Sequence, residues 1–290
     1  MTNTLKGVKE KRNIAITSVV AAVFLTLFKL IVGIITGSLG ILSEALHSGL
    51  DLVAAVITLF AVRYADQPAD EDHNYGHGKI ENYSALIETI LLLITCFWII
   101  YEAIKRLITG KVEIEVTFWS FTIIILSIII DFTRSRALFK TAKKYNSQAL
   151  EADAIHFSTD IWSSAVVLLG LVGVSFNFYF ADPIAALLVA IVIFGISFRI
   201  GKKSFDALMD RAPEGIIEII NSIMKEIPEV KKFHGIKVRE SGPYKFVELN
   251  IHVESNLNIA EAHDISHKVE NAITNKLENT QVTVHIEPDN

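Results

Sequence analysis

The chain has 290 residues, of which 51% are hydrophobic, and its mean hydropathy is +0.42. This hydropathy excludes a wholly soluble protein, yet roughly the last eighty residues are as polar as a soluble domain, so a membrane domain followed by a soluble one is predicted. The net charge is −5, and the basic residues are spread over the loops that flank the apolar segments instead of forming one patch with stacking aromatics, so no nucleic-acid partner is expected. The single cysteine excludes an intramolecular disulfide.

Six apolar segments are each near the roughly 20 residues that a membrane-spanning helix needs. They cover about residues 14–35, 39–63, 83–107, 116–139, 150–175 and 182–201. The first is preceded by the basic cluster Lys6, Lys9, Lys11 and Arg12. Other basic residues follow the second, fourth and sixth segments, so the positive-inside rule predicts that both termini are cytoplasmic. The first segment is too long for a signal peptide and lacks a small-residue cleavage site, which indicates a retained helix.

The first segment also carries Lys29. Its aliphatic stem can lie along a helix while its ammonium reaches the membrane interface, so we favour this snorkelling over a functional role. In the fourth segment Asp131 and Arg134 are three residues apart, a spacing that predicts a local ion pair.

The second segment contains His47 and Asp51, and the fifth contains His156 and Asp160. A spacing of four puts each pair on one helix face, and ionisable groups are costly enough inside a membrane to indicate function. Two imidazoles and two carboxylates suit a tetrahedral Zn²⁺. If the helices are antiparallel, His47 lies level with Asp160, and Asp51 with His156, near mid-bilayer. The alternative is that each pair caps a helix or satisfies neighbouring backbone groups.

The link between the second and third segments is polar and contains Asp70, His73 and His77. These three could form a second metal site or a loading funnel at the cytoplasmic mouth, or the link could be a solvated turn. Asp153 lies three residues before His156. It either extends an acidic path from the cytoplasm or decorates the first turn of a helix.

The polar C-terminal region has the periodicity of helices at 215–227 and 259–277 and of strands at 233–240, 244–254 and 281–287. This α-β-β-α-β order suggests a small ferredoxin-like layer of helices on a sheet. The predicted fold is therefore an α-helical membrane protein with a six-helix transmembrane domain, residues 1–206, followed by a small cytoplasmic α+β domain, residues 207–290.

Histidines are dense in this second domain. They are His234, His252, His263, His267 and His285, and strand alternation puts Glu287 on the same face as His285. Such a density favours a cytoplasmic metal site, and surface histidines without a ligand role are the alternative.

Several motifs together resemble the cation diffusion facilitator family, in particular its bacterial zinc/proton antiporters. They are the six apolar segments, HxxxD in the second and fifth, the link PADEDHNYGHGK, the boundary LMDRAP and the histidine-bearing C-terminal domain. The resemblance covers nearly the whole chain. It implies a transport site of His47, Asp51, His156 and Asp160, a loop site of Asp70, His73 and His77, and a cytoplasmic binuclear site of His234, His252, His263, His285 and Glu287, where relatives often have aspartate. It also implies a homodimer held by the C-terminal domains, with Lys79 and Asp210 as candidates for an interlocking salt bridge.

The leading interpretation is a secondary transporter of the inner (cytoplasmic) membrane that exports Zn²⁺, and possibly other divalent cations, in exchange for protons by alternating access. Its partners would be metal ions, protons, membrane lipid and a second copy of the chain, and Zn²⁺ would be both substrate and a structural or regulatory ligand. An integral-membrane zinc hydrolase would need an open water position, whereas four ligands fill the site, and HExxH is absent from the sequence. A membrane metal sensor is the third class, and it would move no ion.

Overall fold

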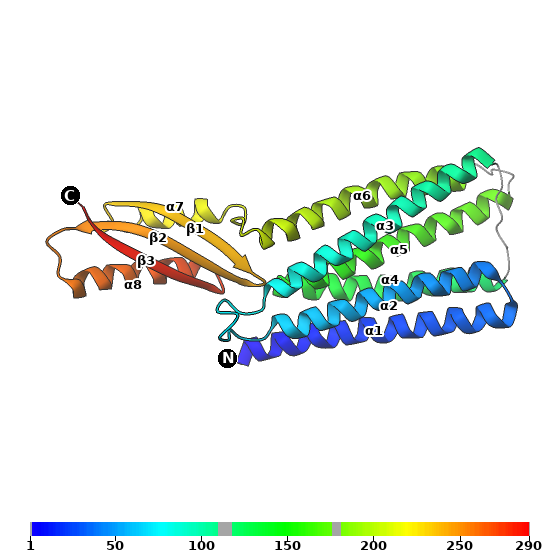
Figure 1. Cartoon of the computed structure of the whole chain (residues 1–290), viewed down its shortest axis with the longest axis horizontal. Coiled ribbons are helices and arrows are strands. Elements are labelled where there is room, and N and C mark those ends of the chain that lie inside the picture. Colours follow the sequence, from blue (N-terminus) through cyan, green and yellow to red (C-terminus); the bar gives the residue numbers. More distant parts are fainter. Residues whose placement is uncertain (1, 110–117, 176–180, 290) are drawn as a thin grey trace. The chain divides into compact units, whose positions relative to one another are not determined.

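The computed structural model describes residues 2–109, 118–175 and 181–289, which form eight helices and three strands (Figure 1). The elements are, in chain order, α1 (Thr2–Thr36), α2 (Leu39–Ala65), α3 (Lys79–Thr109), α4 (Phe118–Tyr145), α5 (Gln148–Ser175), α6 (Ala181–Leu208), α7 (Ile216–Lys225), β1 (Lys232–Ser241), β2 (Tyr244–Glu254), α8 (Ile259–Lys276) and β3 (Thr280–Asp289). The chain divides into two compact units, Met1–Pro68 with Ile80–Ser204, and Ala69–Lys79 with Phe205–Asn290.

The six predicted apolar segments correspond to the helices α1–α6, which are mostly longer than predicted. Residues 116 and 117 of the fourth segment lie outside the described residues. The first helix already begins at Thr2 because the polar residues before the apolar segment include good helix formers such as lysine and glutamate. By length and composition α1, α2, α3 and α6 are able to cross a membrane. A helical membrane domain is therefore confirmed, and the crossing of α4 and α5 stays a prediction.

Four helices of the first unit pack around one core. The helix α1 lies against α2 and α4, and α5 lies against α4 and α2. The core combines the small residues Ala15, Ala55 and Ala154 with the larger Leu138 and Phe157. Small side chains allow the backbones of membrane helices to approach closely. This close packing brings the HxxxD faces of α2 and α5 within reach of each other.

The second unit is a three-stranded sheet with α7 and α8 packed on one face. The hairpin strands β1 and β2 are antiparallel, whereas β3 is parallel to β2 because α8 forms the crossover between them. Alternate side chains of β2, among them Val247, Leu249 and Ile251, enter the core beneath the helices. The predicted α-β-β-α-β order is confirmed. The other face of the sheet carries the remaining side chains of each strand, His252 among them.

The link Ala69–Lys79 belongs to the second unit, which the predicted division into residues 1–206 and 207–290 did not anticipate. Gly78 passes so close to the β1–β2 hairpin that a Cβ atom there would lie 2.3 Å from the carbonyl oxygen of Ser241. The Tyr75 ring packs edge-on against Phe246 with 5.0 Å between ring centroids. The polar composition of the link indicated solvent exposure, and only these tertiary contacts show that it is docked on the hairpin.

Asp210 is held at the start of the second unit by basic side chains. Its Oδ1 lies 2.7 Å from Lys79 Nζ, and its Oδ2 lies 4.0 Å from Arg239 Nη1. The ion pair between Lys79 and Asp210 that the family resemblance implied is therefore present.

Candidate metal sites

The two HxxxD pairs meet between α2 and α5. His156 Nε2 lies 3.1 Å from Asp51 Oδ1 across the helix pair, and His47 Nε2 lies 3.8 Å from Asp160 Oδ1. Within each helix, His47 lies 3.9 Å from Asp51, and His156 lies 3.6 Å from Asp160. Each histidine therefore faces the aspartate of the other helix, the pairing expected for antiparallel helices.

These separations suit a small four-coordinate ion. A tetrahedron with metal–ligand bonds of about 2.0 to 2.1 Å has edges of about 3.3 Å, close to the four histidine–aspartate distances. The ligand atoms of Asp51, His156 and Asp160 all lie within 4.8 Å of one another, and His47 stands outside this closest group. His156 is buried, and the side chains of Asp51 and Asp160 are each 13% exposed. Asp160 Oδ2 and His156 Nδ1 are buried without a hydrogen-bond partner. Buried polar atoms normally have a hydrogen-bond partner, so this carboxylate oxygen is available to a cation.

A cavity of about 80 Å³ lies beside these side chains and is lined by His47, Asp51 and Asp160. Lys29 also lines the cavity, and the prediction that it snorkels to the interface is wrong for this structure. Its side chain is 6% exposed, with Nζ 2.9 Å from Ser48 Oγ and 3.2 Å from Glu44 Oε2. The ammonium instead contacts polar side chains of α2 within the helix bundle, a pairing that the sequence of α1 does not reveal.

Further charged groups are buried around the site. The predicted ion pair of Arg134 and Asp131 is confirmed at 3.1 Å. Arg134 also donates to Ser18 Oγ, and that hydroxyl donates to Asp153 Oδ2. Asp153 is fully buried, so it does not decorate an exposed first turn. On α3, Glu88 is also fully buried and accepts a hydrogen bond from Thr58, a partner that nothing in the sequence pointed to.

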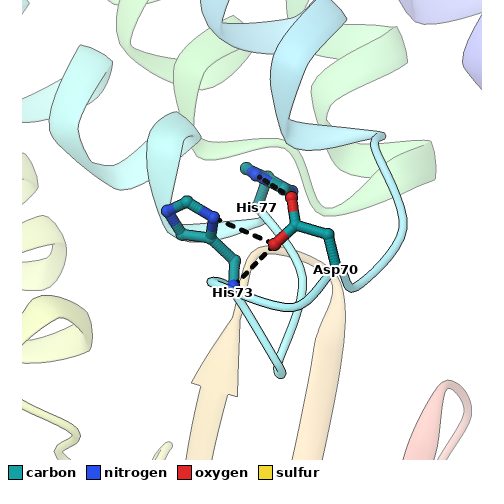
Figure 2. Close-up of side chains that lie close together, drawn as sticks. All are labelled: Asp70, His73 and His77. Atoms are coloured by element: carbon teal, nitrogen blue, oxygen red, sulfur yellow. Dashed lines mark hydrogen bonds and ion pairs between the residues drawn. The ribbon is translucent and has the colours of Figure 1, made fainter.

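The link forms a second group of ligand side chains, Asp70, His73 and His77 (Figure 2). His73 Nδ1 lies 3.2 Å from one oxygen of Asp70, and His77 Nε2 lies 3.4 Å from the other. The His73 backbone N–H also donates to Asp70, and this hydrogen bond holds the pKa of the Asp70 carboxyl below its ordinary value. The carboxylate is therefore ionised at neutral pH and is oriented toward both imidazoles.

A third group lies on the open face of the sheet, where His252 of β2 is paired in register with Glu287 of β3. Glu287 lies 3.4 Å from His252 Nε2, 3.8 Å from His234 Nε2 and 3.9 Å from His285 Nε2. The β1 strand has an irregular register after His234, next to Gly235 with φ +67°, a conformation that favours glycine. Three of the five predicted cytoplasmic ligands therefore gather around the carboxylate of a fourth, Glu287.

The fifth predicted ligand, His263, lies elsewhere in the unit. It is an exposed residue of α8, which packs on the opposite face of the sheet, and its ring lies 4.3 Å from that of His267. Within one chain the sheet therefore separates His263 from the other four. A spacing of four residues puts His263 and His267 on one face of α8, whereas the face of the sheet that α8 covers is decided by tertiary packing.

Comparison with known proteins bears on the whole chain. The cation efflux transmembrane domain matches residues 15–209, and the cation efflux protein cytoplasmic domain matches residues 212–289. An uncharacterized transporter, MJ0449 of Methanocaldococcus jannaschii, is 36% identical over 94% of this chain and 96% of its own length. The cation-efflux pump FieF of Shewanella oneidensis is 32% identical over 93% of this chain and 92% of its own, and FieF of Cronobacter sakazakii is 30% identical over 94% and 91%.

These matches extend over both units, and the helical membrane domain and the small α+β domain follow each other in the matched order. Members of this family are transporters and not enzymes, which confirms the interpretation of the chain as a transporter. The chain belongs to the cation diffusion facilitator family and is a multi-pass membrane protein of the cation efflux type.

Proposed function

We propose that this transporter exports Zn²⁺ from the cytoplasm in exchange for protons, through the site formed by His47, Asp51, His156 and Asp160. The observation that carries the proposal is the convergence of these four side chains from α2 and α5, with cross-helix nitrogen–oxygen distances of 3.1 and 3.8 Å. Substrate sites of alternating-access transporters lie near the membrane midplane between helices, where each side can be opened in turn.

The donor set favours zinc. Two imidazole nitrogens and two carboxylate oxygens suit a borderline-soft ion that accepts four-coordinate geometry, whereas Mn²⁺ prefers octahedral sites rich in oxygen. Proton coupling follows from the same donors, since neutral histidine and ionised aspartate bind metal while their protonated forms do not. A proton arriving at the site therefore competes with the ion and promotes its release.

The remaining parts of the proposal concern topology and assembly. We propose that all six helices α1–α6 cross the inner membrane, that both termini are cytoplasmic, and that two copies associate through their C-terminal domains. The distribution of basic residues supports the orientation, and the match to the family's cytoplasmic domain supports the dimer. Within the second unit, the ion pair of Lys79 and Asp210 joins the link to the segment that follows Leu208.

Zinc is also proposed as a structural or regulatory ligand of the second unit. The supporting observations are the two groups of ligand side chains, one in the link around Asp70 and one on the sheet around Glu287. A second chain would be needed to add His263 to the sheet group, because one chain holds it on the other side of the sheet.

The sheet group is tested by the zinc content of the full-length protein. His252→Ala is expected to lose about one bound zinc per chain, since it removes a ligand 3.4 Å from the shared carboxylate. His267→Ala is the matched control, an exposed histidine that pairs with Glu270 instead. Zinc is counted by elemental analysis after dialysis. Equal zinc content in the two variants would count against the sheet site.

The transport proposal is tested by zinc flux into proteoliposomes under an imposed pH gradient. Uptake of Zn²⁺ is expected to be faster when the lumen is acidic than without a gradient, because protons leaving the lumen drive the ion inward. Mn²⁺ is expected to be taken up at least about tenfold more slowly, since the site offers too few oxygen ligands. A rate of zinc uptake that does not depend on the pH gradient would refute proton antiport. The absence of zinc uptake would refute the proposed transport function.

A further inference from the structure

The cavity beside the zinc site contains charged groups that metal coordination does not use. Its ionisable lining residues come from α1, α2, α4 and α5, and they are Lys29, Glu44, His47, Asp51, Asp131, Arg134 and Asp160. Four of these are carboxylic acids and two are fixed cations. With the carboxylates ionised and the histidine neutral, the lining carries a formal charge of −2.

Each fixed cation is paired with a carboxylate that is not a zinc ligand. Lys29 Nζ lies 3.2 Å from Glu44 Oε2, and Arg134 Nη1 lies 3.1 Å from Asp131 Oδ1. These two pairs are neutral as units. The residual charge of −2 therefore belongs to the two aspartates of the zinc site, and one divalent cation neutralises it.

Of the two cations, Lys29 can be replaced with less disturbance of the surrounding structure. Its side chain is 6% exposed and also donates to Ser48 Oγ, which is adjacent in sequence to a zinc ligand. Arg134 makes several further contacts, with Ser18 and over the ring of Phe157, so its loss would disturb the core. A buried ammonium in an apolar helix is costly unless it is paired or functional. Its pairing with Glu44 explains how it is tolerated and leaves its effect on the ion to be tested.

We propose that Lys29 is a positioning residue that limits the negative charge of the cavity to what one divalent cation neutralises, and so permits the bound metal to leave. This inference rests on the proposed zinc transport. Without Lys29, Glu44 would become an uncompensated carboxylate in the cavity lining, and the formal charge would be −3. A divalent ion would then bind more tightly and dissociate more slowly, since Glu44, whose side chain is 52% exposed, lines the same cavity as Asp51 and Asp160 and its charge attracts the ion.

The kinetic test measures initial rates of zinc uptake against zinc concentration. Lys29→Met is expected to lower the half-saturating concentration and the maximal rate, each about tenfold. The double variant Lys29→Met/Glu44→Gln restores the charge of −2 and is expected to return both constants to within about twofold of wild type. Lys29→Arg keeps the charge and is expected to behave like wild type. A merely structural lysine would not produce tighter binding on its removal, nor rescue by removal of Glu44.

The equilibrium test measures zinc binding to the full-length protein in detergent. His73→Ala and His252→Ala are present in every sample, so that the link and sheet groups do not contribute. The zinc dissociation constant is expected to fall about tenfold in Lys29→Met and to recover in the double variant. Glu44→Gln alone leaves a charge of −1 and is expected to weaken binding about tenfold, which provides a readout if Lys29→Met does not fold.

The outcomes separate the two proposals. Binding that is unchanged or weaker in Lys29→Met, or a double variant that does not recover, overturns the role of Lys29. If Lys29→Met does not fold, unchanged binding in Glu44→Gln overturns it. A wild-type protein that moves no zinc overturns the proposed function instead.

Discussion

Replacing Asp51 or Asp160 by alanine is expected to abolish zinc transport, with the initial rate reduced at least about 100-fold. Even partners that only orient a metal ligand change affinity by about 10- to 100-fold when they are lost, and these two aspartates lie in the site itself. Each removal also leaves one negative charge where a divalent ion needs two. The measurement is zinc uptake by proteoliposomes at matched protein content.

The control must show that the loss is specific. Glu151→Ala changes another acidic residue of α5, one that is partly exposed and pairs with Lys203 at 2.7 Å. Surface pairs contribute little, so its zinc uptake is expected to stay within about twofold of wild type. Size-exclusion chromatography of all three variants reports whether assembly is retained. Normal flux in both aspartate variants would show that the ion does not use this site.

Lys11→Met is expected to destabilise the membrane domain strongly. Lys11 Nζ lies 2.6 Å from Asp66 Oδ1 and 3.1 Å from Glu81 Oε1, and the side chains of Lys11 and Glu81 are 5% and 1% exposed. Without the ammonium, two largely buried carboxylates face each other uncompensated. Breaking a buried ion pair by removing one partner costs about 3 to 5 kcal/mol. A lower thermal unfolding midpoint in detergent is therefore expected.

Two further variants serve as a control and as a partial rescue for this prediction. Lys9→Met removes a neighbouring exposed lysine from the same basic cluster and is expected to change the free energy of unfolding by less than about 0.5 kcal/mol. Lys11→Met/Glu81→Gln removes one of the two buried carboxylates that lost their cation, and it is expected to recover part of the lost stability. If Lys11→Met melts at the same temperature as Lys9→Met, the buried cluster does not contribute to stability.

The sequence by itself determined the elements of this protein and the composition of its central site. The lengths of the apolar segments predicted the helices α1–α6, because a membrane imposes a minimum length, and strand alternation predicted β1–β3. The two HxxxD spacings placed His47 with Asp51 and His156 with Asp160 on single helix faces. These are local properties, since within one helix or strand the sequence spacing of two residues determines whether their side chains point to the same side. That is why the convergence of α2 and α5 could be anticipated from their antiparallel order.

The tertiary structure alone decided which charges are buried and what they face. Lys11 belonged to a basic cluster typical of a cytoplasmic flank, and Lys29 was expected to reach the interface, yet both ammonium groups are buried against carboxylates of other helices. Packing likewise docked the link that contains Asp70 onto the β1–β2 hairpin and placed His263 on the opposite side of the sheet from the other histidines. Ion pairs between distant residues depend on helix rotation and register, which arise from the fit of whole surfaces. Neither composition nor spacing carries that information.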